Sequence, residues 1–281
     1  MEYEFISGEL FSKISDVSIY EKKYLDKYPN IKENSKQIIY ANSRIGKREL
    51  KIIKESRIFF VKTDYLIFFE KYILPFIDHK FIMISHNSAH ISGKNKGILN
   101  NEFLIKWYGQ NMIPHPKTYG IPLGLMNKQW EGSDYSICKK NRNNEKINLL
   151  YFNFSVNTNK DRVVIRDKLL KNGFEQNHKK EWKGYIEDLS THFFCVSPEG
   201  MGVDCHRIWE CLYVGTVPIV LKNDMMYEYF NDLPILWVDS FDDVTEEFLL
   251  KERYRFEKLN WNCDKARLGY WIKLFSDNID I

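Results

Sequence analysis

The segment from Phe193 to Val220 constrains the fold of this chain more than any other. The apolar run 193–196 has the length and composition of a buried strand. Gly200 and Gly202 follow it and bracket a tight turn, where a backbone can approach a ligand closely. A helical stretch comes next, and the apolar run 217–220 predicts a second buried strand. The segment therefore predicts strand, glycine turn, helix and strand, an α/β unit with a parallel sheet.

The helix in this segment combines an apolar surface with a narrow polar one. Asp204 is a natural N-cap and Gly215 a natural stop. At about 100° per residue, His206, Arg207 and Glu210 share one polar arc, and apolar residues cover the remaining surface. The helix would therefore hold a cation and a carboxylate side by side near an N-terminus that favours anions.

Composition excludes several classes of protein. The 281 residues include 44% hydrophobic residues, enough for one large or two medium domains, and the net charge is only +3 with basic and acidic residues interleaved. This pattern is not that of a nucleic-acid binder. No apolar run of about 18 residues predicts a membrane span, and the N-terminus lacks a signal-peptide pattern. The odd number of cysteines favours free thiols, so we expect a cytoplasmic protein.

The first half of the chain contains a βαβ pattern. The apolar run 58–61 predicts a strand, and Thr63 or Asp64 would cap a helix that ends near residue 77. A second strand is predicted at 80–85, and the polar loop 86–90 follows it. Ligand crevices lie beyond the carboxyl ends of parallel strands. We therefore expect the turn at Asp64 and the loop after the second strand to face the same crevice.

The second half of the chain repeats the alternation after a stretch rich in proline and glycine. Residues 109–124 contain prolines and glycines throughout, which predicts a short last strand followed by a crossing between domains. We therefore predict two Rossmann-like domains that face a cleft, at 1–124 and 125–281, with the last helix packing back on the first domain. Further expectations are an irregular start at 1–57 with a strand at 37–41, an exposed loop at 138–146, a helix at 161–171, and a helix capped by Asp242 or Asp243.

The polar residues of the second half suit a nucleotide diphosphate. The glycine turn and Arg207 would hold the phosphates, and Glu210 would accept hydrogen bonds from ribose hydroxyls. The alternative is an Arg–Glu pair on a packed helix. Arg162 either reaches the same phosphates or is a solvated charge in a first helical turn. The candidate donor-binding residues are Ser155, Asn157, Arg162, Ser197, Glu199, Gly200, Gly202, Asp204, His206, Arg207 and Glu210.

The sequence gives little support to a metal site or a dinucleotide site. His86 and His90 have the i,i+4 spacing of zinc ligands, but the glutamate of a zinc protease is missing between them. His86 is instead either a general base or hydroxyl-binding group, or a hydrogen-bonded structural histidine. No Asp-x-Asp, Walker A or Gly-x-Gly-x-x-Gly pattern occurs. We therefore expect no metal and no cofactor.

The segment Pro198-Glu-Gly-Met-Gly-Val-Asp-Cys-His-Arg-Ile-Trp-Glu-Cys-Leu-Tyr-Val-Gly-Thr-Val-Pro-Ile-Val resembles the sugar-nucleotide segment of exostosin-like glycosyltransferases. The pieces at 107–124 and 234–239 resemble further parts of the same family. The resemblance implies a B-type glycosyltransferase fold, with the acceptor on the N-terminal domain and the nucleotide sugar on the C-terminal domain. It also implies a metal-independent, inverting transfer to a glycan hydroxyl, with Asp64 or His86 as the catalytic base.

The donor implied by this resemblance is a UDP-sugar, and UDP-xylose is our first choice. A GDP-fucose-dependent fucosyltransferase is the main alternative, because a similar Gly-Thr-Val-Pro-Ile-Val ending occurs in fucosyltransferases of similar fold. A non-catalytic nucleotide- or glycan-binding module on the same fold is a second alternative. A doubly wound oxidoreductase or phosphate-ligand enzyme is a third, and the missing dinucleotide fingerprint argues against it.

Overall fold

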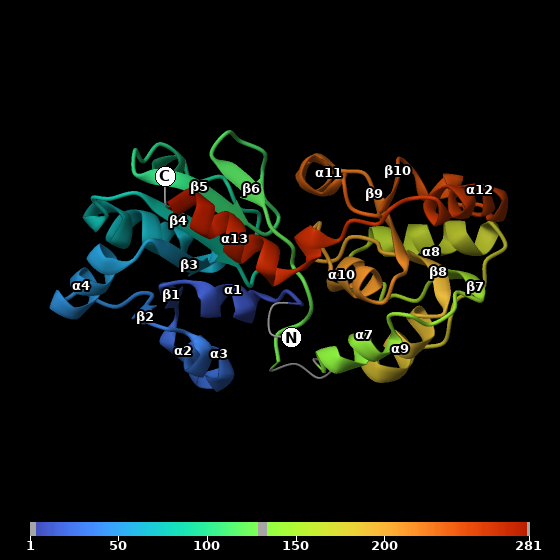
Figure 1. The fold of residues 1–281 in the computed structure, drawn as a ribbon, viewed down its shortest axis with the longest axis horizontal. Helices are drawn as coiled ribbons and strands as arrows, with labels where there is room; N and C mark the ends of the chain where they lie inside the picture. The colour runs from blue at the N-terminus through green and yellow to red at the C-terminus, as the bar shows by residue number, and fades with distance from the viewer. Residues whose placement is uncertain (1–3, 129–133, 280–281) are drawn as a thin grey trace. The chain divides into compact units, whose positions relative to one another are not determined.

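The chain divides into two units, each built round a parallel sheet. The computed structural model describes residues 4–128 and 134–279. Unit 1 contains residues 1–123, 127–129 and 267–281, and unit 2 contains residues 124–126 and 130–266. The division falls close to the predicted boundary at residue 124. The chain is therefore an α/β protein with two Rossmann-like units (Figure 1).

Unit 1 holds a six-stranded sheet in the order β2-β1-β3-β4-β5-β6. Each pair of neighbouring strands in this sheet is parallel. The order reverses between β1 and β3, and such a switch point is where doubly wound sheets bind ligands. Its strands are β1 (Val17–Tyr20), β2 (Ile38–Tyr40), β3 (Ile58–Lys62), β4 (Phe81–His86), β5 (Leu104–Gly109) and β6 (Thr118–Gly120).

Helices cover both faces of the sheet in unit 1. On one face, Phe11 of α1, Ile84 of β4 and Trp271 of α13 share a hydrophobic core. Figure 1 shows α13 lying along this sheet, although it ends the chain. On the other face, Phe59 and Phe69 pack with their ring centroids 5.8 Å apart. The helices of this unit are α1 (Gly8–Ile14), α2 (Lys22–Lys27), α3 (Pro29–Asn34), α4 (Lys47–Glu55), α5 (Leu66–Phe68), α6 (Lys96–Leu99) and α13 (Leu268–Ile279).

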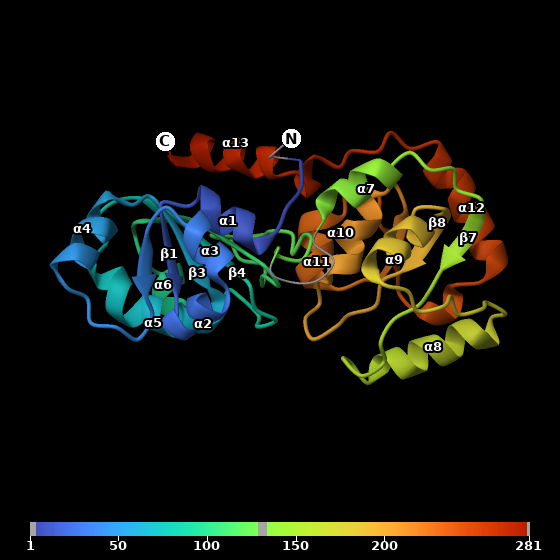
Figure 2. The same ribbon diagram turned by 90° about the horizontal axis from the view of Figure 1, so that it is seen from below.

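Unit 2 holds a four-stranded parallel sheet in the order β10-β9-β8-β7. Phe194 of β8 packs with Leu169 of α8 and Leu249 of α12 in the core on one face. The helices α9 and α10 contact β8 and β9 respectively (Figure 2). The elements are α7 (Tyr135–Asn141), β7 (Asn148–Tyr151), α8 (Asp161–Lys171), α9 (Trp182–Leu189), β8 (His192–Val196), α10 (His206–Tyr213), β9 (Val217–Leu221), α11 (Asp224–Phe230), β10 (Leu236–Val238) and α12 (Glu246–Glu257).

Three local predictions were wrong. The described part of the predicted irregular start, residues 4–57, is regular, since it supplies two strands and four helices to unit 1. Within the predicted exposed loop, α7 ends at Asn141 and Cys138 is fully buried, because this short helix packs against α9 and α10. The predicted cap at Asp242 or Asp243 lies in a 3₁₀ turn, and the hydroxyl of Thr245 caps α12 instead by accepting from the Phe248 N–H.

The helix predicted from residue 63 to residue 77 is also irregular. A 3₁₀ turn at Thr63–Tyr65 leads into α5, a π-helical turn at Phe69–Ile73 and a second 3₁₀ turn at Leu74–Phe76. Neither Thr63 nor Asp64 caps a helix with its side chain, since the cap position is Lys62. Pro75 lacks the N–H that a continuing helix needs, which explains the end of this segment.

No helix within residues 4–128 and 134–279 is both long enough and apolar enough to cross a membrane.

Candidate functional site: an anion pocket in unit 2

The glycine turn of unit 2 is shaped by hydrogen bonds of its own. The Gly200 N–H donates to the Gly202 carbonyl at 3.0 Å. The helix α10 begins at His206, and Cys205 is its N-cap without a side-chain hydrogen bond. The N-cap prediction for Asp204 was wrong, because its buried carboxylate accepts from the Trp209 indole N–H at 2.8 Å. A buried indole needs such an acceptor.

Arg162 joins the loop after β7 to the loop after β8. Its guanidinium donates to three backbone carbonyls, those of Ser155 at 3.0 Å, Pro198 at 3.0 Å and Glu199 at 2.8 Å. Neither predicted alternative for Arg162, a phosphate ligand or a solvated charge, describes this arrangement. A guanidinium presents its donors in a rigid fork, so it can fix several carbonyls at once. Arg162 therefore holds the two loops in place in this structure.

The other predicted residues of the glycine turn also make internal contacts. Ser197 is buried, and its N–H donates to the Ile219 carbonyl at 2.9 Å. Burial raises the pKa of Glu199, whose carboxylate accepts from the Asn223 side chain at 3.4 Å. The Nδ1–H of His206 donates to the Gly124 carbonyl at 2.7 Å, and burial lowers the pKa of this imidazole. These residues shape the turn.

A hydrogen-bonded network links α9 to α10. Arg207 Nε donates to the Tyr185 hydroxyl at 3.3 Å, and that hydroxyl donates to Glu210 Oε2 at 2.9 Å. The Trp182 indole N–H donates to Glu210 Oε1 at 3.0 Å. Glu210 is 5% exposed, so both of its oxygens are engaged inside the protein. Here Glu210 supports the side chains around it, a different role from the predicted contact with a ribose.

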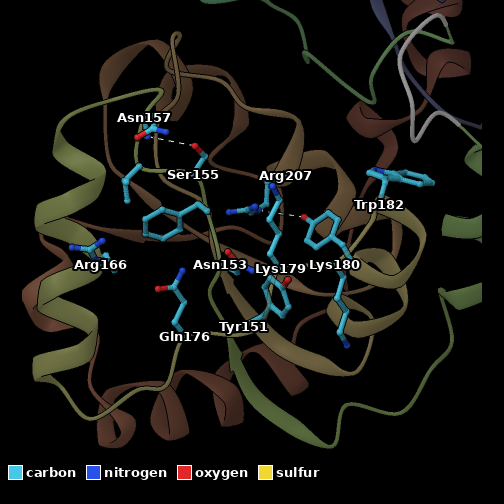
Figure 3. A pocket seen from close by; sticks show the side chains of 13 residues that line it. Tyr151, Asn153, Ser155, Asn157, Arg166, Gln176, Lys179, Lys180, Trp182 and Arg207 are labelled. Carbon is cyan, nitrogen blue, oxygen red and sulfur yellow. Dashed lines mark hydrogen bonds between the residues drawn. The ribbon is translucent and has the colours of Figure 1, made fainter.

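Arg207 lies at the wall of a pocket of about 600 Å³ beside the carboxyl end of β7, which we call the β7 pocket. Figure 3 shows Arg166 reaching toward it from α8 and Trp182 standing on the opposite side, with Arg207 and Tyr151 between them. Ser155, Asn157 and Arg207 are the predicted residues that line it. The complete lining is Tyr151, Asn153, Phe154, Ser155, Val156, Asn157, Arg166, Gln176, Lys179, Lys180, Trp182, Tyr185 and Arg207.

The charged side chains that line the β7 pocket are all positive. Four cations line it, and the lining contains no carboxylate. Arg166 pairs with Asp167 at 2.8 Å and Lys180 with Asp188 at 3.0 Å, but no ion pair is formed by Lys179 or Arg207 in the described part of the chain. Aromatic side chains and neutral amides make up much of the remaining wall. This arrangement suits a ligand that has both a negative group and a flat ring.

The predicted catalytic residues lie in unit 1, at the carboxyl ends of β3 and β4. Asp64 follows β3, pairs with Lys62, and lies 3.6 Å from Nε2 of His90. Burial opposes the charge of Asp64, but the Lys62 ammonium outweighs it and lowers the pKa of this carboxyl. The Thr63 hydroxyl donates to the His86 carbonyl at 3.3 Å. The two loops therefore lie side by side at the carboxyl ends of β3 and β4, and the expectation that they face one ligand crevice stays a prediction.

His86 is buried, and both ring nitrogens are engaged. Nδ1 accepts from the Asn87 N–H at 2.7 Å, and Nε2 lies 3.0 Å from the Pro122 carbonyl, which can only accept a hydrogen bond. The imidazole is therefore neutral with its proton on Nε2. This geometry matches the structural histidine among the predicted alternatives, and Asp64 remains the candidate base. No group of three or more His, Cys, Asp or Glu side chains in residues 4–128 and 134–279 is placed to hold a metal.

Sequence reasoning missed most of the wall of the β7 pocket. Tyr151 and Asn153 were predictable, since they stand at the carboxyl end of a predicted strand. Arg166 is one helical turn beyond Arg162 and shares its side of α8. Gln176 and Lys179 lie between α8 and α9, with no local pattern to mark them. The path of that connection over the sheet edge brings them to the pocket.

No protein-family model matches this chain, and no curated protein matches its sequence. Among solved structures it is similar to an alpha-glucosyltransferase in complex with UDP and a 13-mer DNA containing a HMU base, with 11% identity, a TM-score of 0.37, and coverage of 94% of this chain and 99% of that chain. It is also similar to an alpha-glucosyltransferase in complex with UDP-glucose and DNA containing an abasic site, with 11% identity, a TM-score of 0.32, and coverage of 94% of both chains.

These TM-scores describe a loose likeness, so the fold assignment rests on this chain's own strand order. The resemblance to exostosin-like enzymes stays a prediction, because no family model matches. Both similar proteins were solved with DNA, and the expectation that this chain binds no nucleic acid also stays a prediction.

Proposed function

We propose that this chain is a glycosyltransferase that holds a nucleotide diphosphate sugar in the β7 pocket. The observation that carries the proposal is the lining of that pocket, with four cations, no carboxylate and several aromatic rings at the carboxyl end of a parallel strand. A pocket of about 600 Å³ is within the usual range for a ligand of nucleotide size. The resemblance of residues 198–220 to a sugar-nucleotide segment supports the same ligand class.

The proposed reaction transfers the sugar to an acceptor hydroxyl. The hydroxyl oxygen forms a bond to the anomeric carbon, while the bond from that carbon to the diphosphate oxygen breaks and leaves its electron pair on the diphosphate. Arg207, Lys179 and Lys180 would stabilise the negative charge that develops on the diphosphate leaving group. Asp64, whose carboxyl is ionised at neutral pH, is our candidate to accept the hydroxyl proton.

The finer assignments remain part of this proposal. They are a UDP-sugar donor with UDP-xylose as first choice, an inverting outcome, metal independence and a cytoplasmic location. The anomeric configuration of the product, measured by NMR, tests the stereochemical outcome. Transfer in the presence of EDTA tests the metal independence.

The direct test is calorimetric titration of the full chain with UDP, GDP and their sugars. We expect UDP and a UDP-sugar to bind, and the Arg207→Ala variant to bind at least about tenfold more weakly, because it loses a desolvated charge contact. Arg253→Ala is the matched control, since Arg253 lies on α12 outside the pocket and pairs with Glu257. No binding of any nucleotide to the unmodified chain would refute the proposal.

A non-catalytic binding module is the second candidate, and one observation favours it. His86 has no free ring nitrogen, and Asp64 is already paired with a lysine. The Asp64→Asn variant separates the two candidates. An enzyme would lose most of its transfer activity and keep its nucleotide affinity. A binding module would show no transfer with any acceptor, whether or not Asp64 is changed.

A further inference from the structure

Unit 2 contains a second pocket at the edge of the sheet opposite the β7 pocket. This pocket of about 500 Å³, which we call the β10 pocket, lies beside the edge strand β10. Residues from α11, the approach to β10 and the C-terminal part of α12 with the loop after it form its wall; these elements are labelled in Figure 1. It shares no residue with the β7 pocket. The two pockets are therefore separate sites.

Four aromatic side chains, Tyr227, Trp237, Phe256 and Trp261, line the β10 pocket among a larger number of polar groups. The rings of Tyr227 and Trp237 are nearly perpendicular, with centroids 5.5 Å apart. The indole N–H of Trp261 is fixed by the Phe256 carbonyl at 3.0 Å. By contrast, the indole N–H of Trp237 is buried and has no acceptor among residues 4–128 and 134–279.

The charges of the β10 pocket balance. Its lining contains two cations, Lys222 and Arg255, and two carboxylates, Asp232 and Asp239. Arg255 pairs with Glu252, and Asp232 pairs with Lys265. Lys222 Nζ lies 4.2 Å from the centroid of the Tyr227 ring. The lining also contains the exposed amides Asn231, Asn260 and Asn262. Unlike the β7 pocket, this lining has no excess of positive charge that would select an anion.

We propose that the β10 pocket binds a neutral carbohydrate. A pyranose ring has an apolar face of C–H groups, which packs on an aromatic ring, and an edge of hydroxyls, which need both donors and acceptors. The aromatic rings of the pocket would pack on the apolar face of the sugar. The side-chain amides and the Asp239 carboxylate would form hydrogen bonds with its hydroxyls. This site goes beyond the proposed transfer reaction and does not depend on nucleotide binding.

The test begins with the full chain on an array of neutral hexose and pentose oligosaccharides and of sulfated or uronic-acid oligosaccharides. We expect neutral glycans to bind. The strongest neutral glycan is then titrated by calorimetry against the Tyr227→Ala variant, which should bind it at least about tenfold more weakly, because it loses a stacking face. Asn260→Ala, at an exposed position, should weaken binding several-fold without disturbing the fold.

Tyr254→Ala is the matched control, since Tyr254 is an exposed tyrosine of the same unit outside the pocket, and its glycan affinity should equal that of the unmodified chain. Binding of no neutral glycan would overturn the proposal, and so would a preference for acidic glycans. Equal affinity of Tyr227→Ala, Asn260→Ala and Tyr254→Ala would also overturn it. Nucleotide titrations of the same variants keep failure of this site distinct from failure of the proposed transfer function.

Discussion

The Tyr185 hydroxyl is the central atom of the network beside the β7 pocket. It accepts from Arg207 Nε at 3.3 Å and donates to Glu210 Oε2 at 2.9 Å. Burial and the neighbouring Glu210 carboxylate raise the pKa of Tyr185 well above its usual range, so the hydroxyl stays protonated as a donor at any neutral or mildly alkaline pH. Replacing this tyrosine by phenylalanine removes only the oxygen.

We expect Tyr185→Phe to destabilise the chain by about 1.5–3 kcal/mol. The variant leaves Glu210 Oε2 without its donor, and a hydrogen bond to a buried charged group contributes about this much. The 3.3 Å contact to Arg207 adds less, because it is long. At about 3 °C per kcal/mol for a unit of this size, the melting temperature should fall by about 4.5 to 9 °C.

Chemical denaturation of the unmodified chain and of two variants measures this effect. The matched control is Tyr254→Phe, because Tyr254 is 64% exposed and no hydrogen bond of its hydroxyl occurs in the described part of the chain. We expect the control to lie within about 0.5 kcal/mol of the unmodified chain. If Tyr185→Phe is as stable as Tyr254→Phe, the hydrogen bond from the Tyr185 hydroxyl to the Glu210 carboxylate does not stabilise unit 2, and the prediction is refuted.

Two further predictions concern side chains that bind backbone carbonyls. In Arg162→Lys the shorter donor group cannot reach the carbonyls of both loops, so we expect the free energy of unfolding to fall by about 1–3 kcal/mol. The loops after β7 and β8 should also be cut faster by proteases. Unchanged proteolysis would contradict the role of Arg162 in holding these loops. Lys146 donates to the carbonyls of Ser190 and Val214, and burial lowers its pKa to about 8, below that in the unfolded chain. Between about pH 8 and pH 10.5 the unfolded chain therefore binds more protons at Lys146 than the folded chain does. In this range the free energy of unfolding of the unmodified chain should rise with pH relative to that of Lys146→Met. A difference between the two that does not change with pH would refute the lowered pKa of Lys146.

Much of the architecture was predictable because its signals are local. Uninterrupted apolar runs marked β3, β4, β8 and β9, and the predicted helix at 161–171 matches α8. Gly215, with a φ of 73°, ends the segment of α10 as expected, since glycine adopts this conformation without strain. The strand predicted at 37–41 matches β2, whereas β1 has only four residues and no pattern that marked it as a strand.

The roles of the candidate residues were less predictable, because partners distant in sequence determine them. Arg207 was identified by its place at the start of a helix after a glycine turn, and the structure puts it at a pocket wall. Glu210 shares the same polar arc, yet its partners Trp182 and Tyr185 come from another helix. Arg162 likewise binds carbonyls more than 30 residues away. No spacing rule reports such contacts.

By itself, the sequence determined the α/β class, the two halves with a crossing near residue 124, and the helix that carries Arg207 after a glycine turn, because each follows from periodicity and turn residues over short stretches. Only the tertiary structure decided which polar side chains remain available to a ligand. Burial requires each polar atom to find a partner, and that requirement directs Asp204, Glu210 and Arg162 inward. The edge of the sheet at β7 then brings together the lysines and aromatic rings that the local pattern could not reveal.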